Sequence, residues 1–411
     1  MEPRSIPFLD ADSEPEAVQK ACAGFTRTLA GFSTRWKALS VHALPLWVMR
    51  PFESLEAKDL PLLERIYVTG TLIRQVHQTV RTPPPLLPVI ERSLALHTLH
   101  IEIRQNFDFD LVSLVWGRLK VLHITFADPM NGVVVLQSLS RLCPSLEECS
   151  LDFLVSIDTV TSSPSPVEWP HLRELEFRLS APNGRSLYNF DIHKMLESIT
   201  TPALTSLRVD IWGTGYHDAP IELDLPFHNL IVRSRCELES LVMLTDVGTT
   251  FSNTLHLLSS LTSLTLSMFA DIPDYLTNPR TVFHYQMAMD ALMALGEDLV
   301  CPRLTRLHFV ACHPATASSF LDLVRTRVRE QSVSLAIFKA AFTLSSEGDD
   351  QVLTSVLKEA KPEGLGVRFK WEFWMNRQHG SEKLILPEDG SEVRHYPAFA
   401  INSGQDSRTL S

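Results

Sequence analysis

Histidines, arginines and cysteines are the residues of this 411-residue chain whose spacing could support chemistry. His97 and His100 are three residues apart, a spacing that places two strand side chains on opposite faces, so it does not predict a metal site. The arginines of the segment 325–329 would spread around a helix, which favours a solvated helix face over a phosphate site. The cysteines form no Cys-x-x-Cys pair and are too few for a disulfide scaffold, so we expect them reduced and mostly packed; they lie at positions 22, 143, 149, 236, 301 and 312.

Known catalytic and cofactor motifs are missing from the sequence. It contains no Gly-rich phosphate loop, no Gly-x-Ser-x-Gly elbow, no His-Glu-x-x-His helix and no calcium-binding loop. We therefore expect no catalytic residues, no metal and no cofactor, and we predict that the chain is not an enzyme. The less favoured alternative is an enzyme whose site is assembled from residues scattered along the chain.

Charge and hydropathy exclude two classes of partner. The formal net charge is −11, whereas contact with nucleic-acid phosphates needs clustered positive charge. No apolar run approaches the roughly 18 residues that a membrane span requires, and the first residues do not resemble a signal peptide. We expect no nucleic-acid or membrane binding and a cytoplasmic or nuclear location.

A short phrase returns along the chain: a leucine, two variable residues, an apolar residue, one variable residue and another apolar residue. Looser copies start at Trp36, Leu63, Leu96 and Leu146, and the intervals straddle the roughly 20–29 residues of a leucine-rich repeat. The six clean copies span 119–124, 172–177, 204–209, 238–243, 261–266 and 304–309.

This phrase predicts the fold class. In an extended segment alternate side chains point to opposite faces, so Leu122 and Ile124 should enter the core while His123 faces outward. A single strand cannot bury that face alone, whereas stacked repeats cover one another. We predict an α/β leucine-rich repeat solenoid with a curved parallel sheet on the concave face and helices and loops on the convex face.

The same reading gives the domain organisation. We predict an N-terminal helical cap over 1–33, a leucine-rich repeat domain over 34–375 and a partly disordered C-terminal extension over 376–411. Apolar spacing predicts helices in the return segments, at 132–142, 191–199, 285–295 and 315–329. The segment 367–374 alternates as a half-buried strand, which we expect to close the end of the repeat core; a ligand-stacking platform is the alternative.

The outward positions of successive strands are the candidate partner-binding surface. A charged group there lies next to an apolar pair, Val242 and Leu244, whose exposure would suit an interface with an apolar centre and a polar rim. Alternatively, the charged residues pair with one another across adjacent strands as solvated ion pairs, or the partner binds the convex side or the loop 271–280. The candidate residues are His123, Asp152, Glu176, Arg178, Arg208, Asp210, Val242 and Leu244.

Four segments carry a resemblance to a known family. The segments 32–41, 59–66, 142–148 and 299–304 resemble the repeat region of the F-box and leucine-rich repeat proteins of mushroom-forming fungi, over about residues 20–375. The resemblance implies a substrate receptor of an SCF-type ubiquitin ligase, in which an F-box binds the cullin adaptor and the repeats bind a protein substrate. No F-box is recognisable here, so the adaptor is an expected partner only of a longer form, and a free-standing repeat scaffold is the alternative.

Overall fold

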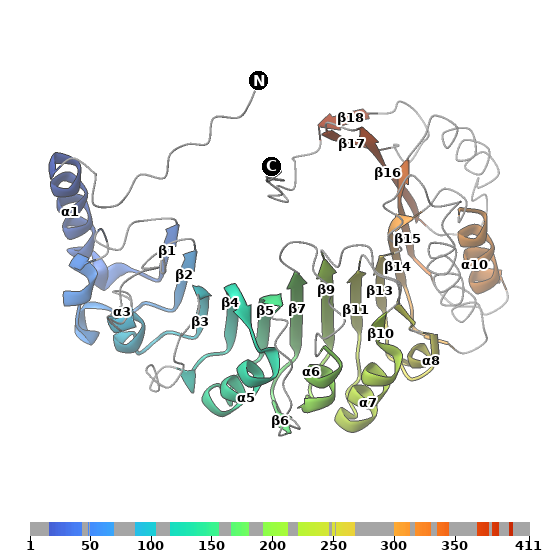
Figure 1. The fold of residues 1–411 in the computed structure, drawn as a ribbon, viewed down its shortest axis with the longest axis horizontal. Helices are drawn as coiled ribbons and strands as arrows, with labels where there is room; N and C mark the ends of the chain where they lie inside the picture. Colours follow the sequence, from blue (N-terminus) through green and yellow to red (C-terminus); the bar gives the residue numbers. More distant parts are fainter. Residues whose placement is uncertain are drawn as a thin grey trace, which may run out of the picture. The chain divides into compact units, whose positions relative to one another are not determined.

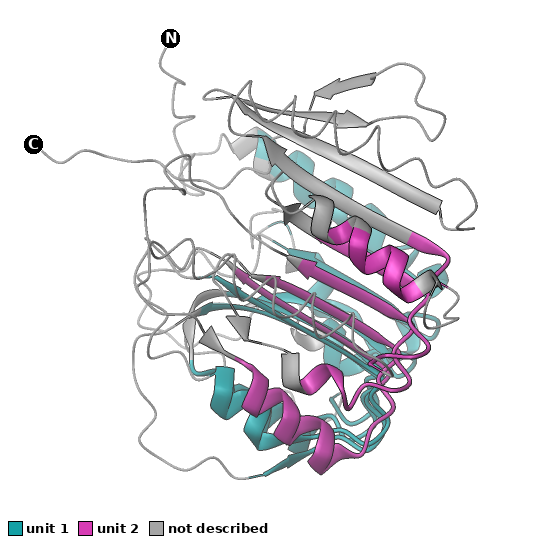
Figure 2. Ribbon diagram, turned by 90° about the vertical axis from the view of Figure 1, so that its right-hand side faces the viewer, with its two compact units in different colours: residues 1–182, 187–204 teal, residues 183–186, 205–411 magenta. Residues whose placement is uncertain are grey.

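A computed structural model gives the arrangement of the chain, which divides into two compact units (Figures 1 and 2). The first comprises residues 1–182 and 187–204, and the second 183–186 and 205–411, so the division falls inside the segment predicted as one repeat domain. That domain prediction stays a prediction. The structure describes residues 16–42, 48, 50–69, 87–103, 116–155, 166–180, 192–212, 221–245, 249–250, 252–267, 300–312, 317–329, 335–344, 368–377, 380–385 and 394–397.

Parallel strands form the centre of the first unit. Each strand pairs with the next one along the chain, except that a short strand intervenes in sequence before the last member. Every strand contains the apolar end of one repeated phrase, which confirms the strands predicted from those phrases. The strands are β1 (Ala38–His42), β2 (Arg65–Thr69), β3 (Thr98–Ile103), β4 (Val121–Met130), β5 (Glu148–Val155) and β7 (Glu174–Ser180).

Helices and short strands complete the first unit. The predicted helices at 132–142 and 191–199 are present as α5 and α6, and the N-terminal cap contains α1. The two return helices pack against each other, and both bury apolar side chains, including Leu136 and Met195. The elements are α1 (Glu16–Ala30), α3 (Leu87–Arg92), α5 (Gly132–Leu142), α6 (Ile192–Ser198), the 3-10 helices η2 (Ser33–Arg35), η3 (Arg50–Ser54) and η4 (Ala57–Asp59), and the paired strands β6 (Val167–Glu168) and β8 (Ile199–Thr200).

The repeated phrase makes the same local structure each time. Its first leucine follows a tight turn, in which the leucine N–H donates to the carbonyl three residues earlier, as Leu172 does to Trp169. The three apolar positions then enter the core: Leu172, Leu175 and Phe177 are at most 2% exposed. Burial alternates along β7, since its side chains fit the two-residue period of a strand.

The second unit repeats this plan. Parallel strands run from β9 to β16 in sequence order within its sheet, and two antiparallel strands follow. The predicted strand at 367–374 is present as β16, and the two strands beyond it were not predicted. They are β9 (Ser206–Trp212), β11 (Ser240–Thr245), β13 (Ser263–Ser267), β14 (Arg306–Cys312), β15 (Ile337–Leu344), β16 (Arg368–Arg377), β17 (Gly380–Ile385) and β18 (Arg394–Pro397).

Return segments of the second unit contain helices and a small parallel pair. The predicted helix at 315–329 is present as α10, whereas α7 and α8 were not predicted. The predicted helix 285–295, the loop 271–280 and the end of the predicted disordered extension, 398–411, lie outside the described residues. The elements are α7 (Asp224–Ser234), α8 (Ser252–Leu255), α10 (Ala317–Arg329), β10 (Ile221–Glu222) and β12 (Thr249–Thr250). The chain is therefore a mixed α/β protein built around parallel strands.

Candidate protein-interaction surface

Three rings lie in contact on the outward face of the first unit. Tyr67, His100 and His123 occupy the same position on β2, β3 and β4 and are register partners of one another. The ring centroids of Tyr67 and His100 are 4.4 Å apart, and those of His100 and His123 are 3.8 Å apart with an interplanar angle of 15°. We call these three residues the ring row. Because parallel strands lie about 4.8 Å apart, side chains at matching positions come into direct ring contact.

The two imidazoles are held neutral. Burial and, to a smaller extent, the charge of the neighbouring His123 together lower the pKa of His100 to about 4. The pKa of His123 is also lowered, mainly by burial, with Arg178 acting in the same direction and Glu176 and Glu174 opposing it. At neutral pH the ring row is therefore a half-buried strip that bears no charge.

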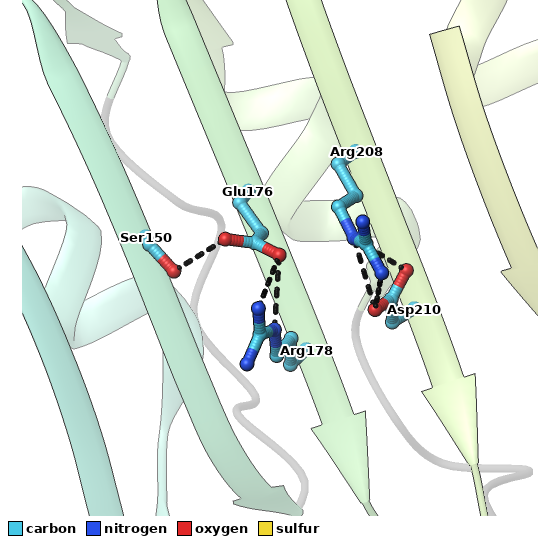
Figure 3. Close-up of polar contacts among 5 residues, drawn as sticks. All are labelled: Ser150, Glu176, Arg178, Arg208 and Asp210. Atoms are coloured by element: carbon cyan, nitrogen blue, oxygen red, sulfur yellow. Dashed lines mark hydrogen bonds and ion pairs between the residues drawn. The ribbon is translucent and has the colours of Figure 1, made fainter.

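A polar cluster continues the same row on the next two strands (Figure 3). Ser150 on β5 is in register with Glu176 on β7, and its hydroxyl donates to Glu176 Oε2 at 2.8 Å. Arg178, two residues along the same strand, donates from Nε to Glu176 Oε1 at 2.9 Å, and its Nη2 lies 2.9 Å from the same oxygen. The Arg178 side chain is 50% exposed and that of Glu176 19%, so this ion pair contributes under about 1 kcal/mol to stability.

Carboxylates gather at this end of the first unit. Glu148 and Glu174 are register partners on β5 and β7, and Asp152 is the register partner of Arg178. Burial raises the pKa of Glu148, and the charges of Glu174 and Glu147 raise it further. We call Glu148, Asp152, Glu174 and Glu176 the acidic end of the row. Arg178 supplies the basic group among them.

The second unit carries the other four predicted residues. Arg208 on β9 donates from Nε to both carboxylate oxygens of Asp210 at 3.1 Å, and from Nη2 to Oδ2 at 2.8 Å (Figure 3). The Asp210 side chain is 5% exposed and that of Arg208 40%. Val242 and Leu244 on β11 are the register partners of Arg208 and Asp210. Both are half-buried between neighbouring strands, and the apolar interface centre expected at these two residues stays a prediction.

The structure thus groups His123, Asp152, Glu176 and Arg178 in the first unit, and Arg208, Asp210, Val242 and Leu244 in the second. It places each arginine against the carboxylate two residues away on its own strand. The candidate residues predicted from the sequence did not include Tyr67, His100, Glu148 or Glu174. The alternation of the strands could have identified Glu148 and Glu174. Each lies two residues before an outward position and therefore shares its face.

Four of the cysteine thiols are placed unfavourably for chemistry. Burial raises the pKa of Cys143 and Cys301 to about 12 and that of Cys236 to about 11, and it raises the pKa of Cys149 as well. Thiolates are the reactive form, so these four thiols are poor nucleophiles. Within the described ranges, no three His, Cys, Asp or Glu side chains gather as a metal ion would require.

Comparisons with known proteins add no assignment. No family model matches the chain, and a search of curated proteins gave no significant match. Among the described residues, the helices are all too short or too polar to cross a membrane.

Proposed function

We propose that this chain is a non-catalytic protein-binding module, built as a leucine-rich repeat solenoid, whose partner binds the outward side chains of the parallel strands. The observation that carries the proposal is the continuous row on the first unit, in which five consecutive strands contribute matching outward positions. These are Tyr67, His100, His123, Ser150 and Glu176. Such a row joins half-buried rings to polar groups, the composition of an interface with an aromatic centre and a polar rim.

Support for the solenoid comes from the repeating backbone. The turn before the strand recurs with the same hydrogen bond at Leu96, Leu119 and Leu146 in the first unit, and at Leu261 and Leu304 in the second. Each turn feeds a strand that pairs in register with its neighbour in the same unit, so that leucines stack on leucines, as Leu99 does on Leu122. Repeats of this kind bury a core only by covering one another.

The specific role that we propose is substrate recognition, as in the receptors of SCF-type ubiquitin ligases that the sequence resembles. Without an F-box in this chain, contact with the cullin adaptor is proposed only for a longer form. The alternative is a free-standing repeat scaffold or regulator. Burial raises the pKa of the thiols of Cys143, Cys149 and Cys301, so an enzyme with a dispersed site would need a nucleophile other than these groups.

Affinity capture from a cell extract tests the proposal when it compares three forms of the full chain. The first is the wild type, the second carries Tyr67→Ser and His100→Ser in the ring row, and the third carries Val134→Ser on α5, whose side chain is 51% exposed. We expect a stoichiometric partner with the wild type and the Val134 variant, and its loss with the ring-row variant, while far-ultraviolet circular dichroism stays unchanged.

If all three forms recovered the partner equally, the interface would lie outside the ring row and the proposal would be overturned. Recovery of a cullin and its adaptor among the partners would favour the ubiquitin role. A single partner without them would favour the free-standing scaffold.

A further inference from the structure

The outward face of the first unit changes in character from one side to the other. The ring row lies on β2, β3 and β4, where the imidazoles are neutral at pH 7. The acidic end lies on β5 and β7, where the described outward positions hold four carboxylates and one guanidinium. An occupant of the whole face would meet apolar rings at one end and net negative charge at the other.

Two features of the acidic end bear on its negative charge. Glu148 and Glu174 stand directly opposite each other in register, an arrangement of like charges that destabilises a sheet. Arg178, the basic group of this end, already forms an ion pair with Glu176. The mutual repulsion of Glu148 and Glu174 would fall if a cation from outside lay between them.

The dimensions of the face limit what can cover it. Five parallel strands from β2 to β7 span roughly 19 Å at about 4.8 Å per interval. An extended chain advances roughly 3.3 Å per residue, so about six residues cross this distance. Lysine and arginine suit such a path, because their carbon stems pack on apolar surface while their charged heads reach a carboxylate.

We propose that this face binds an extended protein segment of about six residues, with lysine or arginine over the acidic end and an apolar side chain over the ring row. The inference rests on the proposed function and names the partner's chemistry. The net charge of −11 also favours a basic partner segment, since it attracts basic segments at long range and repels acidic ones.

A peptide-display selection on the purified full chain tests this inference. The probe is a library of random twelve-residue peptides, selected at low salt on the immobilised wild type. We expect enriched peptides that carry lysine or arginine within about six residues of an apolar side chain, and whose binding weakens as the salt concentration rises to about 0.5 M.

A double and a single carboxylate-to-amide variant then locate the binding. Glu148→Gln with Glu174→Gln should weaken the selected peptides roughly 2- to 30-fold, the range that two exposed ion pairs provide. Glu197→Gln, on the exposed side of α6, removes a carboxylate elsewhere and should leave binding unchanged. Because the double variant relieves repulsion, its thermal unfolding temperature should not fall, so that weaker binding cannot be a folding defect.

The outcomes separate this inference from the proposed function. One outcome would be selected peptides that lack lysine and arginine, lose binding with Tyr67→Ser and His100→Ser, and bind the carboxylate variants as they bind the wild type. This outcome would overturn the inference of a basic segment but would leave the proposed binding face intact. A second outcome would be peptides whose binding neither pair of substitutions changes, or a selection that enriches no peptide. Either result would overturn the inference and would also count against the outward face as the binding site.

Discussion

At the scale of single residues, burial and the stacking of His100 on His123 keep these two positions of the outward face uncharged at neutral pH. With the two rings 3.8 Å apart, charging either imidazole would also disfavour a charge on the other. Burial contributes the larger part of this cost, because the half-buried rings lose part of their hydration. The ring row therefore meets a partner as an apolar strip at neutral pH, although it contains two ionisable groups.

The titration of His100 is a direct prediction of this arrangement. The ring signals of His100 in a two-dimensional NMR titration should shift with a midpoint at about pH 4, below the ordinary histidine value of 6.5. His100→Gln assigns the signal by removing it. A midpoint at or above 6.5 would contradict the burial and stacking seen here.

The same shift fixes the sign of a stability effect. Between pH 6.5 and about 4 the unfolded chain binds a proton at His100 that the folded chain does not, so the free energy of unfolding should fall as the pH decreases through this window. Above pH 6.5 this contribution is constant. Denaturant unfolding at several pH values should show a shallower decline for His100→Gln than for the wild type.

Residue types along a strand predict which side chains face outward, but not which of them interact. The alternation of apolar residues along the strands correctly placed His123, Glu176 and Arg178 on the same face. It could not distinguish a ring contact between Tyr67 and His100 from isolated side chains, because ring contact depends on the register between strands. The half-burial of Val242 and Leu244 also depends on neighbours that sequence alone does not supply.

At the scale of secondary-structure elements, strands were easier to predict than helices. Each phrase has three apolar positions at fixed spacing, and the strand followed wherever all three were large. β15 escaped prediction because its phrase, starting at Leu335, has the small Ala340 at the last apolar position, although Ala340 is the register partner of Phe309. α7 contains Pro226 in its first turn, where the missing N–H is tolerated, and this proline obscured the helix.

Two glycines in helices should respond oppositely to alanine. A Cβ at Gly132, in the first turn of α5, would collide with the buried side chain of Met195 on α6. We expect Gly132→Ala to lower the free energy of unfolding by about 1–2 kcal/mol, with the flexibility of methionine limiting the cost. Gly24 in α1 has open space around it, so Gly24→Ala should raise the free energy of unfolding by about 0.5–1 kcal/mol.

Denaturant unfolding of a double-mutant cycle measures the Gly132 contact. Combining Gly132→Ala with Met195→Ala should cost less than the sum of the two single changes, because the second removes the atoms that the first displaces. Strict additivity would mean that the α5 and α6 helices do not approach as closely as the structure shows.

At the scale of the whole molecule, the described end of the second unit's sheet bears on solubility. β16 is ten residues long and pairs with β15 on one side and β17 on the other, and β18 then pairs with β17. β18 is only four residues long and ends at Pro397, and short strands with proline are poor templates for pairing with another chain. The sequence predicted a partly disordered extension over 376–411 and neither β17 nor β18.

Removing this antiparallel pair should therefore promote self-association. A chain that ends at Arg377 exposes the backbone N–H and carbonyl groups of the long strand β16 along the edge that β17 now covers. We expect it to form concentration-dependent oligomers in size-exclusion chromatography with light scattering, whereas a chain that ends at Pro397 keeps both strands and behaves as the full chain does. If both truncated chains had the same association state as the full chain, β17 would not be protecting an edge, and its pairing would contribute to local stability alone.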